Sequence, residues 1–420
     1  MPRGRFEAPI LMLLSLLASA SATRAPITAY RVDDATRFTF TGRVLRGFDA
    51  SAPGGVTFDL EGTTLLFTVA NATFIGLNVS DRTRGGARLG VYFDSDDAPD
   101  NSSLHAMSSR TEGDPNPAGR ALPPTARVAT LVTSSQQSLY TLGSGGQIVG
   151  LGVGGALGVR VELLSEWSHL GDSPTGLFSF AAVVTDGVVL SAPRPPTRRL
   201  LVLGDSLSSG PGAGYTVPVT GALCGDGVLL NDWSGTWNAL LCRNFSAACE
   251  VVAMSGATIS GTPYNIPMSL PWALGAMGDD AWPAGARAPW SAPVDAVFVE
   301  LGENDCHAFN CTAPTGRATL AASFVALAHK LSAAQPAGNA LPIWFTLANH
   351  EAGQSAAMTD AVSTLRAAGF TNTALLNGTT PTLGPGGVYI ANGCAGHPSA
   401  AQNELAFARL RPIVAQALGW

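Results

Sequence analysis

The stretch LLVLGDSL, residues 200–207, decides the fold of the second half of the chain. Its four leading apolar residues predict a strand buried on both faces, as in a parallel sheet, and a tight turn follows. Ligands of α/β sheets bind at the carboxyl ends of the strands, so Ser206 stands at the edge where chemistry is expected. The positive end of the next helix would favour an anion there. The alternative interpretation is a serine that only caps that helix.

Strands and helices alternate after this turn. Four nearly continuous apolar runs predict buried strands: residues 200–203, 251–253, 294–301 and 343–347. Helix-like stretches follow or separate them: residues 233–245, 320–334, 356–368 and 399–418. The last of these contains Pro412, where we expect a kink. The alternation predicts an α/β domain with a parallel sheet over residues 200–420.

The first half of the chain has a different pattern. From about residue 38 to 190, short runs of alternating apolar residues are interrupted by glycine, aspartate and asparagine, which is typical of an all-β sandwich. We place this domain at residues 30–190, with a long surface loop at 94–124. The proline-rich stretch at residues 191–199 predicts a linker between the two domains. A length of 420 residues also favours two domains.

The N-terminus predicts export. Residues 1–22 combine an early positive charge, a short apolar run and the small residues of a cleavage site, as in a secretory signal peptide, so we expect an extracellular protein. Six N-x-S/T sequons agree with this: Asn71, Asn78, Asn101, Asn244, Asn310 and Asn377. Six cysteines follow residue 220: Cys224, Cys242, Cys249, Cys306, Cys311 and Cys394. Because exported proteins fold in an oxidising environment, we expect these cysteines to form disulfides. The short stretches of chain between them suggest the pairs Cys242/Cys249 and Cys306/Cys311.

Composition excludes several classes of partner. The net charge is −6 with a single lysine and no basic run, which disfavours nucleic-acid binding. No apolar run is long enough to span a membrane. No C-x2-C or paired-histidine spacing predicts zinc, and the cluster of Asp94, Asp96, Asp97 and Asp100 lacks the spacing of a calcium loop. We therefore expect no metal and no cofactor; the sequence sets no oligomeric state.

Three further strand-end motifs make Ser206 more informative. Gly256 follows the second strand, where a glycine lets its backbone N–H approach a ligand, and Asn304 follows the third. His397 precedes the last helix and is suited to act as a base at neutral pH. The N–H groups of Ser206 and Gly256 and the amide of Asn304 are candidates for an oxyanion hole. Together these four motifs predict a serine hydrolase site.

This set of motifs resembles the SGNH (GDSL) hydrolases, whose Ser, Gly, Asn and His fall here on Ser206, Gly256, Asn304 and His397. The resemblance covers residues 198–420 and implies a flavodoxin-like three-layer α/β/α fold with ester hydrolysis through an acyl-enzyme. The preceding β domain, jelly-roll-like by this resemblance, makes the chain similar to carbohydrate esterase family 2, which removes acetyl groups from polysaccharides such as xylan. The segment DWSGTWNALL, residues 232–241, carries part of this likeness.

One position departs from the superfamily pattern. Most SGNH enzymes have an acid three residues before the histidine, and here that residue is Cys394. Family 2 carbohydrate esterases are similar in lacking it and use a Ser–His dyad whose histidine is oriented by a backbone carbonyl. The resemblance therefore implies a dyad of Ser206 and His397, with a carbonyl fixing the tautomer.

Other residues have competing interpretations. Asp205 is expected to tighten the turn, and Glu303 and Asp305 are read as loop structure rather than as a glycosidase pair. His307 and His350 also follow strand ends and are alternatives to His397. Four tryptophans are candidates either for packing or for a sugar-stacking platform: Trp233, Trp237, Trp282 and Trp290.

The sequence thus predicts a secreted serine esterase that removes O-acetyl groups from carbohydrate. One alternative is a lipase or general carboxylesterase with the same machinery. Another is a non-catalytic carbohydrate-binding protein on the same fold, which the missing acid before His397 keeps open.

Overall fold

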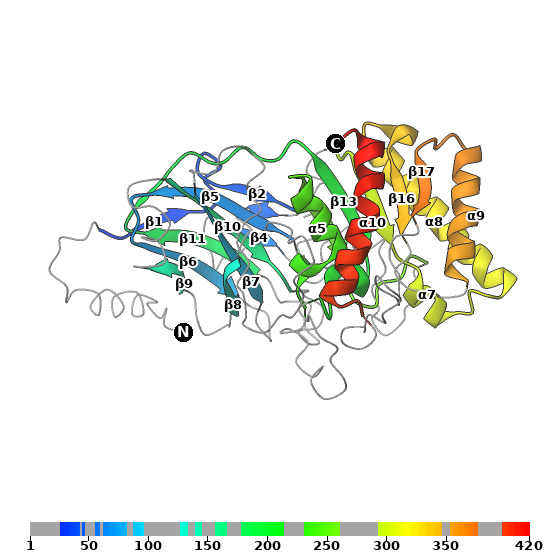
Figure 1. Cartoon of the computed structure of the whole chain (residues 1–420), viewed down its shortest axis with the longest axis horizontal. Helices are drawn as coiled ribbons and strands as arrows, with labels where there is room; N and C mark the ends of the chain where they lie inside the picture. Colours follow the sequence, from blue (N-terminus) through cyan, green and yellow to red (C-terminus); the bar gives the residue numbers. More distant parts are fainter. Residues whose placement is uncertain are drawn as a thin grey trace, which may run out of the picture.

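The computed structural model (Figure 1) describes residues 26–42, 44–46, 55–58, 62–81, 87–95, 127–132, 139–144, 156–165, 178–213, 231–260, 293–346, 353–376 and 397–420. The expected signal peptide lies outside the described residues, as do nearly all of the expected loop at 94–124 and Cys224, Trp282, Trp290, His350 and Cys394.

Residues 28–189 form two six-stranded antiparallel sheets. The first contains β1 (Thr28–Arg31), β3 (Leu45–Arg46), β4 (Val56–Phe58), β6 (Phe74–Asp81), β9 (Leu139–Ser144) and β11 (Phe178–Thr185). The second contains β2 (Thr39–Thr41), β5 (Thr64–Ala70), β7 (Arg88–Ser95), β8 (Arg127–Val132), β10 (Ala156–Leu163) and β12 (Val188–Val189). Alternate residues of each sheet, such as Phe67 on β5 and Leu77 on β6, share one buried core. The expected all-β sandwich is present.

Residues 199–376 contribute a five-stranded parallel sheet. Its strands are β13 (Arg199–Gly204), β14 (Ala248–Ala253), β15 (Ala296–Glu300), β16 (Ile343–Thr346) and β17 (Thr373–Leu376), in the spatial order β14-β13-β15-β16-β17. This is the doubly wound order in which the first two strands exchange places, with a switch point between β13 and β15. The sequence predicts the first four strands and misses β17.

Helices cover both faces of this sheet, which gives three layers (Figure 1). On one face α8 (Pro314–Ala334) and α9 (Gln354–Ala367) pack on Leu201 and Leu203. On the other face α5 (Trp237–Asn244) and α10 (Ala400–Leu418) pack on Leu200 and Val202. The short elements are α3 (Ser206–Ser209), η3 (Trp233–Gly235), α7 (Glu303–Ala308) and η4 (Gly338–Ala340).

The expected helices at residues 233–245 and 399–418 differ in their continuity. The first is in fact η3 followed by α5, because Thr236 between them has extended backbone and caps α5 with its side chain. The closing helix α10 is confirmed, with Ser399 and Gln402 forming a capping box and Pro412 inside the helix.

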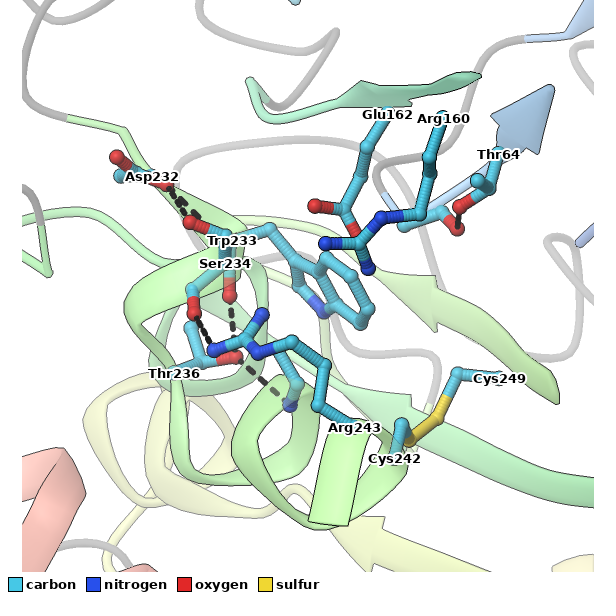
Figure 2. Close-up of polar contacts among 12 residues, drawn as sticks. Thr64, Arg160, Glu162, Asp232, Trp233, Ser234, Thr236, Cys242, Arg243 and Cys249 are labelled. Carbon is cyan, nitrogen blue, oxygen red and sulfur yellow. Dashed lines mark hydrogen bonds and ion pairs between the residues drawn. A yellow bond between two sulfur atoms is a disulfide. The ribbon is translucent and has the colours of Figure 1, made fainter. Parts of the chain in front are cut away.

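The β-sandwich contacts the α/β part through the segment at residues 231–236. The Trp233 amide donates to Leu164 O at 2.9 Å, and Arg88 Nη1 donates to Asn231 O at 2.7 Å. The Trp233 ring packs so closely on Gly62 that a Cβ there would lie about 3.0 Å from it. Figure 2 shows Arg160 and Glu162 of β10 gathered with Trp233 and Arg243 at this junction. Polar groups from both halves of the chain are therefore buried together.

Both cysteine pairs suggested by short loops are confirmed. Cys242–Cys249 joins α5 to β14, and Cys306–Cys311 joins α7 to the turn before α8. Within the described residues no cysteine is free. Of the helices described, none is both long enough and apolar enough to cross a membrane.

Candidate active site

Ser206 is the first residue of α3 and directly follows the turn at the end of β13. Asp205 caps this helix, because its Oδ1 accepts a hydrogen bond from the Leu207 amide at 3.0 Å. Gly210, in the left-handed region with φ of 105°, ends the helix after one turn. The serine is half-buried, at the carboxyl edge of the sheet. The expected role of Asp205 in the turn is confirmed.

Gly256 lies in the turn after β14, the strand that neighbours β13. Its φ of 79° is a conformation that side-chain-bearing residues rarely adopt. The end of this turn is held by a carboxylate: Asp305 accepts from the Ile259 amide at 3.0 Å and from the Ser260 amide at 2.8 Å. Asp305 therefore fixes the turn that carries Gly256.

Asn304 lies in the first turn of α7, directly after β15, the other neighbour of β13. Its side chain is buried, and its Nδ2 donates to Ala257 O at 3.1 Å and to Asp205 Oδ2 at 3.3 Å. One amide thus bridges the Gly256 turn and the Ser206 turn. The structure brings together three of the four predicted motifs, at the ends of three adjacent strands.

His397 is half-buried and lies two residues before Ser399, the N-cap of α10. The start of this helix is anchored to α5, because Asn403 Oδ1 accepts from the Trp237 amide at 3.0 Å. Through this anchor, the start of α10 is connected to Trp237, whose indole N–H donates to the Glu300 carboxylate. The direct pairing of His397 with Ser206 stays a prediction.

Glu300, the last residue of β15, is the functional candidate that the sequence did not reveal. It is buried and accepts from Ser208 Oγ at 2.5 Å and from Trp237 Nε1 at 3.0 and 3.1 Å. Asn238 Nδ2 donates to Ser208 O at 3.0 Å. These bonds join α5 and β15 to α3, the helix that begins with Ser206. The only signal in the sequence is an acidic residue inside an apolar run.

The site is acidic. Burial raises the pKa of Asp205 well above its ordinary value, and the nearby Glu303 carboxylate adds to this effect. Burial also raises the pKa of Asp305 and raises that of Glu300 to about 7, although the hydrogen bonds from Ser208 and Trp237 oppose the latter shift. In the described part of the chain, none of these three carboxyl groups forms a salt bridge.

Several predicted interpretations change. Trp233 and Trp237 are 3% and 2% exposed, so both are packing residues and cannot form a sugar-stacking surface. Glu303 and Asp305 lie in helix α7 rather than in a loop. His307 lies on the same helix, 3.9 Å from the Glu303 carboxylate.

Where side chains are described, no group of three His, Cys, Asp or Glu residues is placed to hold a metal ion.

Comparison with solved structures gives extensive likeness in fold. The family 2 carbohydrate esterase of Clostridium thermocellum, solved in complex with cellohexaose, is 18% identical, with a TM-score of 0.65 over 91% of this chain and 99% of its own. An acetyl xylan esterase of Butyrivibrio proteoclasticus is 13% identical, with a TM-score of 0.68 and coverage of 94% and 99%. A Bacteroides ovatus structure described as that of a GDSL-like lipase is 12% identical, with a TM-score of 0.54 and coverage of 94% and 98%.

No protein-family model matches the sequence, and neither does any curated protein. The structural likeness spans both halves of the chain, and the chain shares the two-domain fold of family 2 carbohydrate esterases and the fold of SGNH hydrolases. The resemblance inferred from the four motifs is therefore confirmed at the level of the fold.

Proposed function

We propose that this chain is a secreted serine esterase that removes O-acetyl groups from carbohydrate. The observation that carries the proposal is the Asn304 amide, which bridges the Ser206 turn and the Gly256 turn at the carboxyl ends of three adjacent strands. A nucleophile and oxyanion donors are needed within one small volume, and this edge of the sheet supplies candidates for both.

In the proposed reaction, His397 takes the proton of Ser206 Oγ as the oxygen attacks the acetyl carbonyl. The new carbonyl oxyanion receives hydrogen bonds from the Ser206 and Gly256 amides and from Asn304. The longer bond of Asn304, to Asp205 at 3.3 Å, is the one that substrate would replace. Collapse of the tetrahedral intermediate breaks the ester bond, and His397 protonates the sugar alkoxide as it leaves.

Water then releases acetate from the acyl-enzyme, with His397 again taking a proton. The residue three positions before His397 is Cys394, which has no carboxylate. We therefore propose that a backbone carbonyl orients the imidazole. The scheme uses only side chains and backbone amides, and we propose that it requires no cofactor.

The neighbouring folds favour a carbohydrate ester as substrate, because they include an acetyl xylan esterase and an esterase that binds cellohexaose. A lipase or general esterase is the second candidate, favoured by the GDSL-like lipase with the same fold. A non-catalytic glycan-binding protein is the third, because the acid three residues before His397 is missing.

The test is acetate release from acetylated xylan and from an aryl acetate by the full-length protein and its Ser206→Ala variant. Ser363→Ala, an exposed serine on α9, is the matched control. We expect release by the parent and the control, loss in Ser206→Ala, and a preference for acetyl over longer acyl esters. Preference for long acyl chains would favour the lipase. Glycan binding without turnover, unaffected by Ser206→Ala, would establish the binding protein.

A further inference from the structure

Glu300 lies at a buried position, where a charged residue is unfavourable unless other groups stabilise it. It ends β15 in register with Gly204, the last residue of the neighbouring strand β13, which leads directly to Ser206. The side chain is 2% exposed, and no cation pairs with it among the described residues. A carboxyl group buried in this way depends on hydrogen bonds for its stability.

Those hydrogen bonds come from two helices. Ser208 Oγ, on α3, donates to Oε2 at 2.5 Å, and Trp237 Nε1, on α5, lies 3.0 and 3.1 Å from the two carboxylate oxygens. Ser208 reaches Glu300 only because Gly204 has no side chain, since a Cβ there would overlap the Ser208 side chain. Glu300 therefore connects the sheet to the helix of the nucleophile.

Helix α3 depends on such contacts. It has four residues, and a helix of a single turn has almost no stability of its own. Asp205 holds its start, and Asn238 Nδ2 binds Ser208 O at 3.0 Å. The Glu300 bond is the one that draws the side of the helix against the sheet. The orientation of Ser206, at the start of α3, follows from these attachments.

We propose that Glu300 is a positioning residue for Ser206, and that its ionised form holds α3 in the reactive position. This inference rests on the proposed esterase function. Hydrogen bonds to an ionised carboxylate are about twice as strong as those to a neutral one, so protonation of Glu300 loosens α3. The nucleophile then becomes less reactive as the pH falls.

Burial of the carboxyl group places this change near neutral pH. Burial raises the pKa of Glu300 to about 7, the bonds from Ser208 and Trp237 oppose the shift, and the Glu303 carboxylate on α7 adds to it. Asp205, at the start of α3, is the other titratable neighbour, and its pKa is raised by burial. Both neighbours are acidic, so neither supplies a compensating positive charge.

The experiment measures the rate at which a fluorophosphonate probe labels Ser206 in the full-length protein between pH 5 and 9. This readout needs the nucleophile and its base but no particular ester substrate. Because the ionisation of Glu300 is added to those of the base and of Asp205, the parent rate at low pH should fall with one more power of the proton concentration than the rate of Glu300→Gln. Glu300→Gln should also be about 10- to 100-fold slower at pH 8. Glu404→Gln, which changes a glutamate on α10 whose pKa is also raised by burial, should behave as the parent.

A second variant keeps the test valid if Glu300→Gln folds poorly. Ser208→Ala removes a bond that stabilises the carboxylate, so the pKa of Glu300 should rise and the pH midpoint of labelling should move upward. The indole N–H resonance of Trp237, identified by its loss in Trp237→Phe, should titrate near pH 7 in the parent and should not titrate in Glu300→Gln.

The outcomes separate the two proposals. A parent that is not labelled would overturn the esterase function itself. If the parent is labelled but its pH profile matches that of folded Glu300→Gln, the positioning role alone would be overturned. The same would follow if Ser208→Ala had the same pH midpoint of labelling as the parent. Labelling that depends on Glu300 without acetate release would support the positioning role and redirect the search to another acyl substrate.

Discussion

Gly204 and Ser208 are in direct contact across the turn that carries Ser206: a Cβ on Gly204 would overlap the Ser208 side chain. The glycine of the GDSL stretch is thus required by packing against a serine four residues later. The same approach lets Ser208 reach the carboxylate of Glu300.

Gly204→Ala should therefore displace α3. Overpacking of this kind costs about 1–3 kcal/mol of stability, and we expect acetate release to fall as well. Urea denaturation and steady-state rates would measure both effects. The double variant Gly204→Ala/Ser208→Gly removes the overlapping side chain and should regain part of the lost stability. Equal stability of the single variant and the parent would show that the turn adapts freely.

Asp305→Asn should loosen the Gly256 turn. The carboxylate accepts hydrogen bonds from two backbone amides. The side chain of asparagine would present an N–H to one of these amides, which costs about 1–3 kcal/mol of stability. We expect a lower kcat with little change in KM, because the oxyanion donors are displaced. Asp360→Asn, which breaks an exposed ion pair with Arg317, is the matched control and should leave the stability nearly unchanged.

Arg88→Met tests the contact between the two halves of the chain. Arg88 is buried on β7, donates to Asn231 O and lies 3.8 Å from the Asp232 carboxylate. Removing a buried charge that faces another costs about 3 kcal/mol. The Asp232 amide bonds Gly210 O at the end of α3, so the esterase rate should fall too. Arg37→Met, at a more exposed ion pair, should leave both stability and rate nearly unchanged.

Stability should depend on pH through Glu300. Its pKa of about 7 in the folded protein exceeds the ordinary value of 4.5, so the folded state binds the proton more tightly. The stability from this group is complete below pH 4.5 and is lost as the pH rises to 7, by about 3 kcal/mol. Between pH 4.5 and pH 7, the free energy of unfolding of the parent should therefore fall more steeply with rising pH than that of Glu300→Gln. Parallel curves would contradict the raised pKa.

The parts of the fold that follow from continuous apolar runs could be predicted from the sequence. The strand at residues 200–203 is buried on both faces, and no charge interrupts its pattern. In contrast, β17 is short and only partly buried, so its pattern carries little signal. Helix α7 could not be predicted because its sequence ENDCHA is polar and has the composition of a loop.

The candidate site divides in the same way. Ser206, Gly256 and Asn304 follow strands, and the order of the strands alone brings them to one edge. The positions of Glu300 and Trp237 depend on side-chain contacts between elements 63 residues apart, which no local pattern encodes. The roles of the tryptophans at 233 and 237 are ambiguous in the sequence for the same reason, since an indole suits both a core and a sugar surface.

The main-chain hydrogen bond from the Trp233 amide to Leu164 O joins the α/β part to the β-sandwich. A shortened protein that begins at the proline-rich stretch would leave the indole of Trp233 without the backbone of Gly62 beneath it and Asn231 without Arg88. We therefore expect the α/β part to lose stability without the β-sandwich, and a hybrid that exchanges it for the sandwich of a relative would have to carry over the counterparts of Gly62, Arg88 and Leu164 together.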